Sequence, residues 1–191
     1  MRLALTLAIG IATVALCGCG SQSYRDTQAG KFSGDLDVRW VRNDQFLFVP
    51  SAAKPFTFVR TNGRHIAPGP MYTDGGSIPR FLWGASGLSP WGYAPAYMVH
   101  DWLFEAKHCG YPADGNFTFE ETAVVMAEGL KAIMDADAAV RDDFVFGAIV
   151  AGVRTPIARK IWDEGACKAP RAPMEFRDPE AGQLIMTIRF P

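Results

Sequence analysis

The stretch Asp35-Leu36-Asp37-Val38-Arg39-Trp40 alternates polar and apolar side chains. Successive side chains of a β-strand point to opposite faces, so this period of two predicts a strand with one buried face. Two further strand signals follow, at residues 46–49 and at residues 56–67, the second interrupted by Asn62-Gly63. Asn-Gly adopts the positive φ angles of a type I′ turn at low cost, so residues 56–61 and 64–67 are expected to form a hairpin.

The second half of the chain carries helix signals. Pro95 and Pro156 each suit the first turn of a helix, and Thr118 with Glu121 forms the pattern of a capping box. The expected elements are helices at residues 95–107, 118–134, 138–153 and 156–162, and a closing strand with alternating apolar residues at 184–190. This order predicts an α+β fold, in which a small antiparallel sheet of N-terminal strands and a C-terminal strand is packed by three to four helices.

The first residues have the features of a secretory signal peptide. Met1-Arg2 is a short positive segment, and residues 3–16 are apolar apart from small or hydroxyl-bearing side chains. The run Leu16-Cys17-Gly18-Cys19 resembles the bacterial lipobox, whose last cysteine receives palmitate and related acyl chains and becomes the new N-terminus. The alternative is an ordinary cleavage site with incidental cysteines. The expected parts are a lipoprotein signal peptide at residues 1–18, a flexible tether at 19–33 and a single domain at 34–191.

The sequence also bears on location and partners. Gly20 stands where an aspartate commonly retains a lipoprotein in the inner membrane, so we expect a lipid anchor on the periplasmic face of the outer membrane. The chain has 19 basic and 20 acidic residues and no basic stripe, which argues against nucleic-acid binding. No stretch after the leader approaches the ~20 apolar residues of a membrane span. The nearest is Phe144–Val153, which Asp143 and Arg154 bound.

Two cysteines remain after the expected processing, Cys109 and Cys167. A lone pair of cysteines in an oxidising compartment often forms a disulfide, although sequence spacing alone does not bring two Cα atoms within bridging distance. If the bridge forms, it ties the end of the helix at 95–107 to a C-terminal segment. The pairing is left open at this point.

Reactive side chains gather in two short runs, Thr73-Asp74-Gly75-Gly76-Ser77-Ile78-Pro79-Arg80 and His100-Asp101-Trp102-Leu103-Phe104. Residues three and four apart share a helix face, and the neighbours of His100 at this spacing are all apolar or aromatic. A carboxylate or imidazole on such a surface needs hydrogen-bonding partners. We therefore expect contact between the two runs, with Asp74 near His100 and Arg80 near Asp101.

Three interpretations of these runs stay open. In the first, the cluster is a buried polar network, with Ser77 as a helix cap after the Asp74-Gly75-Gly76 turn. In the second, Asp74, Ser77, His100 and Asp101 are catalytic, with Ser77 as a nucleophile or His100 as a general base; the sequence lacks the complete G-x-S-x-G elbow. In the third, Asp74, His100 and one more ligand hold a metal, since three protein ligands suffice for catalytic zinc. The sequence identifies no cofactor.

These same runs resemble phage-associated domain-of-unknown-function family 1353, whose recurring pattern is T-D-x-A-S-I-P-R followed by H-D-x-L-Y on an apolar helix. Gly76 stands in place of the alanine and Phe104 in place of the tyrosine. The resemblance covers a phage-type core at about residues 56–162 and implies no established activity. It also leaves the lipoprotein leader and the C-terminal strand as additions to that core.

Two functions follow as expectations. The first is a non-catalytic envelope lipoprotein that binds peptidoglycan or an envelope protein, with the polar cluster as a structural network. The second is a cell-envelope hydrolase directed at peptidoglycan, in which Asp74, His100 and Asp101 do acid–base or metal-dependent work. A third and narrower expectation, a phage-derived superinfection or lysis factor, is motivated only by the phage association of the family that these runs resemble.

Overall fold

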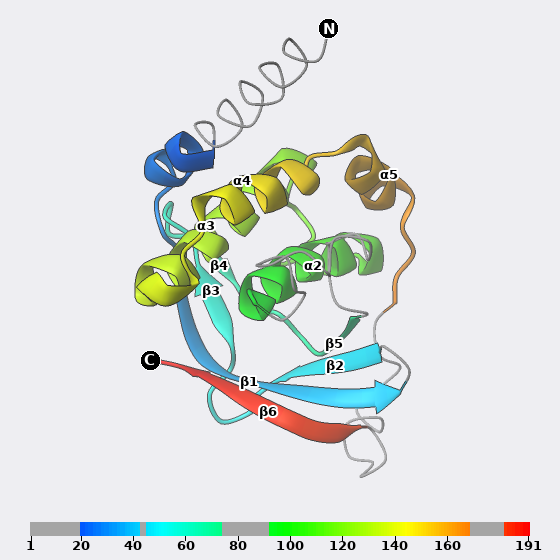
Figure 1. Cartoon of the computed structure of the whole chain (residues 1–191). Helices are drawn as coiled ribbons and strands as arrows, with labels where there is room; N and C mark the ends of the chain where they lie inside the picture. The colour runs from blue at the N-terminus through cyan, green and yellow to red at the C-terminus, as the bar shows by residue number, and fades with distance from the viewer. Residues whose placement is uncertain (1–19, 43–44, 74–91, 169–181) are drawn as a thin grey trace, which may run out of the picture.

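A computed structural model describes residues 20–42, 45–73, 92–168 and 182–191. It has an α+β fold, as predicted: an antiparallel sheet of six strands lies below a layer of helices (Figure 1). The strand order is β4-β3-β1-β2-β5, and β6 also pairs with β1. Within the described residues, no helix is long and apolar enough to cross a membrane.

The central strand is β1 (Lys31–Arg42), which contains the alternating stretch at residues 35–40. It pairs with β2 (Gln45–Pro50) and with β6 (Gln183–Phe190), and its first residues pair with β3 (Thr57–Val59). Leu36 and Val38 are fully buried, so the period of two defines the core face of this strand as far as Val38, whereas Trp40 is 44% exposed. The pairing of β1 with both β3 and β2 makes the sheet curl around the helices (Figure 1).

The alternation predicted for β6 is broken near its start. Val38 pairs with Met186 whereas Arg39 pairs with Leu184, so the register shifts around Ile185. An extra residue in one strand reverses the faces beyond it, so Leu184 lies on the face of Arg39 whereas Met186 lies on the face of Val38. Leu184, Ile185 and Met186 are all nearly half exposed, so this end of β6 has no buried face.

The hairpin predicted around Asn62-Gly63 is present, but its turn differs from the prediction. Strand β3 pairs with β4 (His65–Ile66). Arg60 N–H donates to Arg64 O, and Gly63 N–H donates to Arg60 O, both at 2.9 Å. Gly63 adopts a positive φ, of 82°. These contacts define a three-residue loop, with a turn over 60–63 and Gly63 in the left-handed position, in place of a two-residue type I′ turn. Strand β5 (Met71–Thr73) closes the sheet beside β2.

The first two predicted helices are slightly longer than expected. Helix α2 (Ala94–Cys109) ends at Gly110, whose φ of 69° is left-handed. Helix α3 (Phe119–Ala136) begins with the predicted capping box, in which Thr118 and Glu121 each bind the other's backbone N–H. The two helices pack closely: a Cβ built on Gly129 of α3 would lie 3.1 Å from the Cβ of Ala96.

The prediction of a single helix at residues 138–153 is wrong. A short 3₁₀ turn, η2 (Ala138–Val140), precedes a separate helix α4 (Asp143–Gly152). The cause is local, because the side chain of Asp142 accepts the N–H groups of Phe144 and Val145 and so starts a new helix. Helix α5 (Pro156–Glu164) follows, with Thr155 as its cap.

The prediction of a flexible tether at residues 19–33 is also wrong for residues 20–33, the part that the structure describes. Residues 20–26 form a helix, and β1 already begins at Lys31. Tyr24 is 1% exposed and its ring meets Phe146 edge-on, at 5.2 Å between centroids. Its hydroxyl donates to Asp135 at 2.5 Å, and the Nζ of Lys131 lies 3.6 Å from its ring centre. One aromatic side chain in a polar segment thus fixes that segment to α3 and α4.

Candidate functional site

Only some of the polar side chains selected from the sequence belong to the part of the chain that the structure describes. His100, Asp101, Cys109 and Cys167 are described. Cys19, Asp74, Ser77 and Arg80 lie outside the described residues, and so do the expected contacts of Asp74 with His100 and of Arg80 with Asp101. Thr73, the first residue of the T-D-x-A-S-I-P-R motif, ends β5 and is buried.

His100 lies in the interior of the protein. It is 2% exposed, and its ring lies 5.0 Å from that of Phe104, one turn further along α2. Its Nδ1 is 3.2 Å from Oδ1 of Asp101, whose side chain is 23% exposed. Helix α2 turns its apolar face and His100 towards the core, because Tyr97, Met98 and Leu103 are buried there. The imidazole is therefore enclosed in the protein interior.

A second polar contact on α2 was not foreseen. The indole Nε1 of Trp102 donates to Oδ2 of Asp114 at 2.8 Å, and the same oxygen accepts Ala67 N–H at 3.3 Å. Asp114 is 5% exposed, and Tyr111 stacks on the indole ring of Trp102 at 5.3 Å. Gly69 allows the chain to pass this ring, since a Cβ at that position would lie 2.9 Å from it. Asp114 thus links α2 to the segment between β4 and β5.

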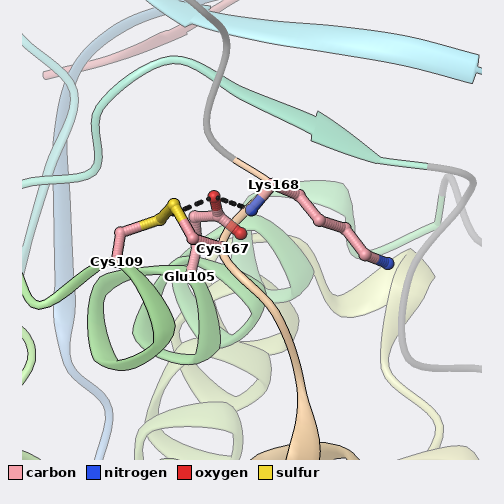
Figure 2. Close-up of a disulfide and its surroundings, with 4 residues drawn as sticks. All are labelled: Glu105, Cys109, Cys167 and Lys168. Carbon is pink, nitrogen blue, oxygen red and sulfur yellow. Dashed lines mark hydrogen bonds between the residues drawn. A yellow bond between two sulfur atoms is a disulfide. The ribbon is translucent and has the colours of Figure 1, made fainter.

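The end of α2 carries a disulfide between Cys109 and Cys167 (Figure 2). Oε1 of Glu105 lies 3.1 Å from Sγ of Cys109 and accepts the backbone N–H of Lys168 at 2.8 Å. Burial raises the pKa of Glu105, while the Lys168 N–H and His108 oppose that shift. A bridged sulfur has no proton, so a hydrogen bond between Glu105 and Cys109 requires the protonated carboxyl group as donor.

Two basic side chains extend this attachment to α5. Lys107 Nζ donates to the carbonyl oxygen of Trp162, and Nε2 of His108 lies 3.0 Å from the same oxygen. Trp162 is 4% exposed, and its ring meets that of Phe104 edge-on, at 4.9 Å. Asp101, Glu105 and His108 follow one another at a spacing of four and three residues on α2. Each of these side chains makes different contacts, so they do not form a common ligand set.

An ion pair between the hairpin and α3 was also missed. Arg60 donates from Nε to Oε2 of Glu128 at 2.9 Å and from a terminal nitrogen to Oε1 at 3.4 Å. Arg60 is 7% and Glu128 4% exposed, and Thr61 Oγ1 donates to Glu128 Oε1 at 2.8 Å. Glu121 lies 3.8 Å from Arg60 and from Arg64. The sequence signal was present: Glu128 lies one turn from Val125 and Ala132 on a largely apolar helix.

Among the described residues, one group has the composition and spacing of a metal site, namely Glu105, Cys109 and Cys167, whose ligand atoms lie within 4.8 Å of one another. Zinc and other thiophilic metals bind thiolates, and a disulfide supplies none. In the bridged state these residues therefore do not fit a metal. A separate groove of about 420 Å³ is lined by Phe119, Glu120, Val124 and Arg154, none of them a predicted site residue.

Comparison of the chain with protein-family models, with curated proteins and with solved structures returned no match. The function proposed below rests on the sequence motifs and on the geometry of α2.

Proposed function

We propose that this chain is a bacterial envelope lipoprotein that carries a phage-type domain of unknown function and acts as a non-catalytic binding or structural module. The lipid on Cys19 anchors it, on the periplasmic face of the outer membrane. Its partner is peptidoglycan or an envelope protein. The leader and the lipobox-like run at residues 16–19 support the anchor.

The observation that carries the non-catalytic role is the burial of the α2 polar groups. His100 is 2% exposed, and the neighbouring Trp102 and Glu105 hydrogen bond to Asp114 and Lys168. A general base must come within hydrogen-bonding reach of substrate, which an enclosed imidazole does poorly. The same side chains join α2 to the β4–β5 segment and to the chain after α5, as a structural network does.

Membrane attachment is tested with Cys19→Ser in the full chain. The wild type is expected to incorporate palmitate and to fractionate with outer membranes, and the variant to lose both the label and the membrane attachment. A wild type without label, recovered in the soluble periplasmic fraction, would contradict the anchor. Trypsin protection in intact cells checks the periplasmic orientation.

The role of His100 is tested with His100→Ala, and the exposed His65→Ala is the matched control. Loss of a buried, packed ring is expected to lower the free energy of unfolding by about 2–5 kcal/mol, with the control nearly unchanged. Peptidoglycan turnover is measured for the wild type, for His100→Ala and for Asp74→Asn. Turnover by the wild type that is lost in stably folded variants would establish the hydrolase in place of the binding module.

A further inference from the structure

Helix α4 has an unusual outer face. No ionisable side chain occurs between Phe144 and Val153. Val145, Phe146, Ile149 and Val150 are buried, while Phe144 is 53% exposed and Ala151, two turns later, is also exposed. A helix that is apolar all round is normally enclosed on every side by protein or lies in lipid. Within the described residues, the face with Phe144 and Ala151 is exposed.

The first described residues lie directly on this helix. A Cβ on Gly20 would lie 2.6 Å from the carbonyl oxygen of Asp143, and a Cβ on Gly147 would lie 2.9 Å from the Cα of Gly20. Only glycine at both positions allows such a close approach of two backbones. Tyr24 holds the other end of the same short helix against Phe146 and Asp135. Residue 20 is therefore held against the first turns of α4.

This contact fixes where a lipid on Cys19 would leave the domain. Consecutive Cα atoms are about 3.8 Å apart, so the acylated residue begins within one peptide unit of Gly20. The proposed tether would have let the domain take any orientation, but residues 20–26 are helical. The membrane surface must then lie close to the start of α4.

Both acidic and basic side chains flank this face. Asp142 accepts two backbone N–H groups at the start of α4, and Asp143 pairs with Arg141 at 2.9 Å. At the other end of the helix, Arg154 is exposed. An exposed arginine beside an apolar face suits a surface of anionic phospholipid.

We propose that the outer face of α4, centred on Phe144 and Ala151, rests on the phospholipid surface of the membrane that holds the lipid anchor. The bilayer itself covers this face, and the contact gives the domain one orientation relative to the membrane. This inference depends on the proposed lipidation of Cys19. It adds a direct contact of the folded domain with the membrane.

The test uses the full acylated protein in vesicles of phosphatidylethanolamine and phosphatidylglycerol. The substitutions Phe144→Cys and Ala151→Cys each supply one free thiol for a nitroxide label, because Cys19 is acylated and Cys109 is bridged. Ile185→Cys is the matched control, since Ile185 is an apolar residue with 49% exposure on β6, in the sheet layer remote from α4 (Figure 1). Electron paramagnetic resonance then compares collisions of each label with oxygen, which concentrates in lipid, and with a water-soluble nickel chelate.

The oxygen-to-nickel ratio is expected to be several-fold higher at positions 144 and 151 than at position 185. Acylation is read independently from the mass of the N-terminal peptide, and attachment from vesicle flotation. A protein that is acylated and floats, with equal ratios at all three positions, overturns this inference and leaves the proposed function standing. A protein without the lipid overturns both. Ala151→Cys keeps the test decisive if the label at 144 disturbs folding.

Discussion

The indole N–H of Trp102 and the carboxylate of Asp114 form a 2.8 Å hydrogen bond between two buried side chains. Because the same carboxylate oxygen also accepts Ala67 N–H, one side chain joins α2 to the segment between β4 and β5. A buried donor that loses its acceptor costs about 1–3 kcal/mol, and Asp114 accepts from the buried Trp102 as well as from the backbone of the exposed Ala67.

Asp114→Ala is therefore expected to lower the free energy of unfolding by about 2–4 kcal/mol. Asp114→Asn keeps one acceptor oxygen and should lose less. Urea unfolding followed by tryptophan fluorescence measures both, with the exposed Asp26→Ala as the control, for which almost no change is expected. Equal stability of Asp114→Ala and the wild type would show that water replaces this carboxylate.

The buried Arg60–Glu128 pair predicts that a single substitution lowers the free energy of unfolding more than a double substitution does. Glu128→Ala leaves the guanidinium of Arg60 buried without its main partner, which is expected to cost about 3–5 kcal/mol. Replacing both residues, as Arg60→Met with Glu128→Leu, is expected to recover most of that loss. The control is Glu120→Ala, because Glu120 pairs with Arg159 on the surface and such pairs contribute at most about 1 kcal/mol. A double variant no more stable than Glu128→Ala would rule out this coupling.

The disulfide predicts a loss of stability on reduction. It joins residues 58 positions apart, and a closed loop of this size contributes about 4 kcal/mol in the chain-entropy account. The double substitution Cys109→Ser with Cys167→Ser should therefore unfold at lower urea than the oxidised wild type. Reducing the wild type under native conditions provides the matching comparison, and the two results should agree. Unchanged stability in both would mean that the bridge adds nothing to the fold.

Glu105 predicts a pH dependence whose sign follows from its raised pKa. A carboxyl group with a raised pKa in the folded state binds its proton more tightly there than in the unfolded chain. Its contribution to stability is therefore fully present at acidic pH and is lost as pH rises above the ordinary value of 4.5 and through the folded-state pKa. Glu105→Gln stays neutral at every pH, so the stability of the wild type relative to this variant should fall as pH rises. Urea unfolding of both proteins across this range measures the difference, and a constant difference would contradict the shift.

The parts of the fold that the sequence predicts are those with local causes. The alternation in β1 and the capping box of Thr118 and Glu121 each act over a few residues, and both are present as expected. The break before α4 is also local, because Asp142 is a favourable cap residue, but its signal was masked by the continuous apolar run that follows.

The remaining features depend on residues far apart in the sequence. Tyr24 and Asp135 are 111 positions apart, and Arg60 and Glu128 are 68 apart, so no local pattern pairs them. The same reason applies to Asp114, whose partners come from α2 and from Ala67. By contrast, the burial of His100 follows from its apolar neighbours on one helix, and it is 2% exposed. The expected pairing of His100 with Asp74 lies outside the described residues and stays a prediction.

The pairing of β1 with β6 has a consequence for the order of folding. Thr187 Oγ1 donates to the side chain of Asp37, and these residues are 150 positions apart. During synthesis, the central strand of the sheet is therefore made long before the strand that covers its edge. Closing so large a loop slows folding, and an uncovered strand edge can meanwhile pair with other chains. The chain is thus most exposed to aggregation between the appearance of β1 and the arrival of β6, and a chaperone that shields β1 in this interval would raise the folded yield.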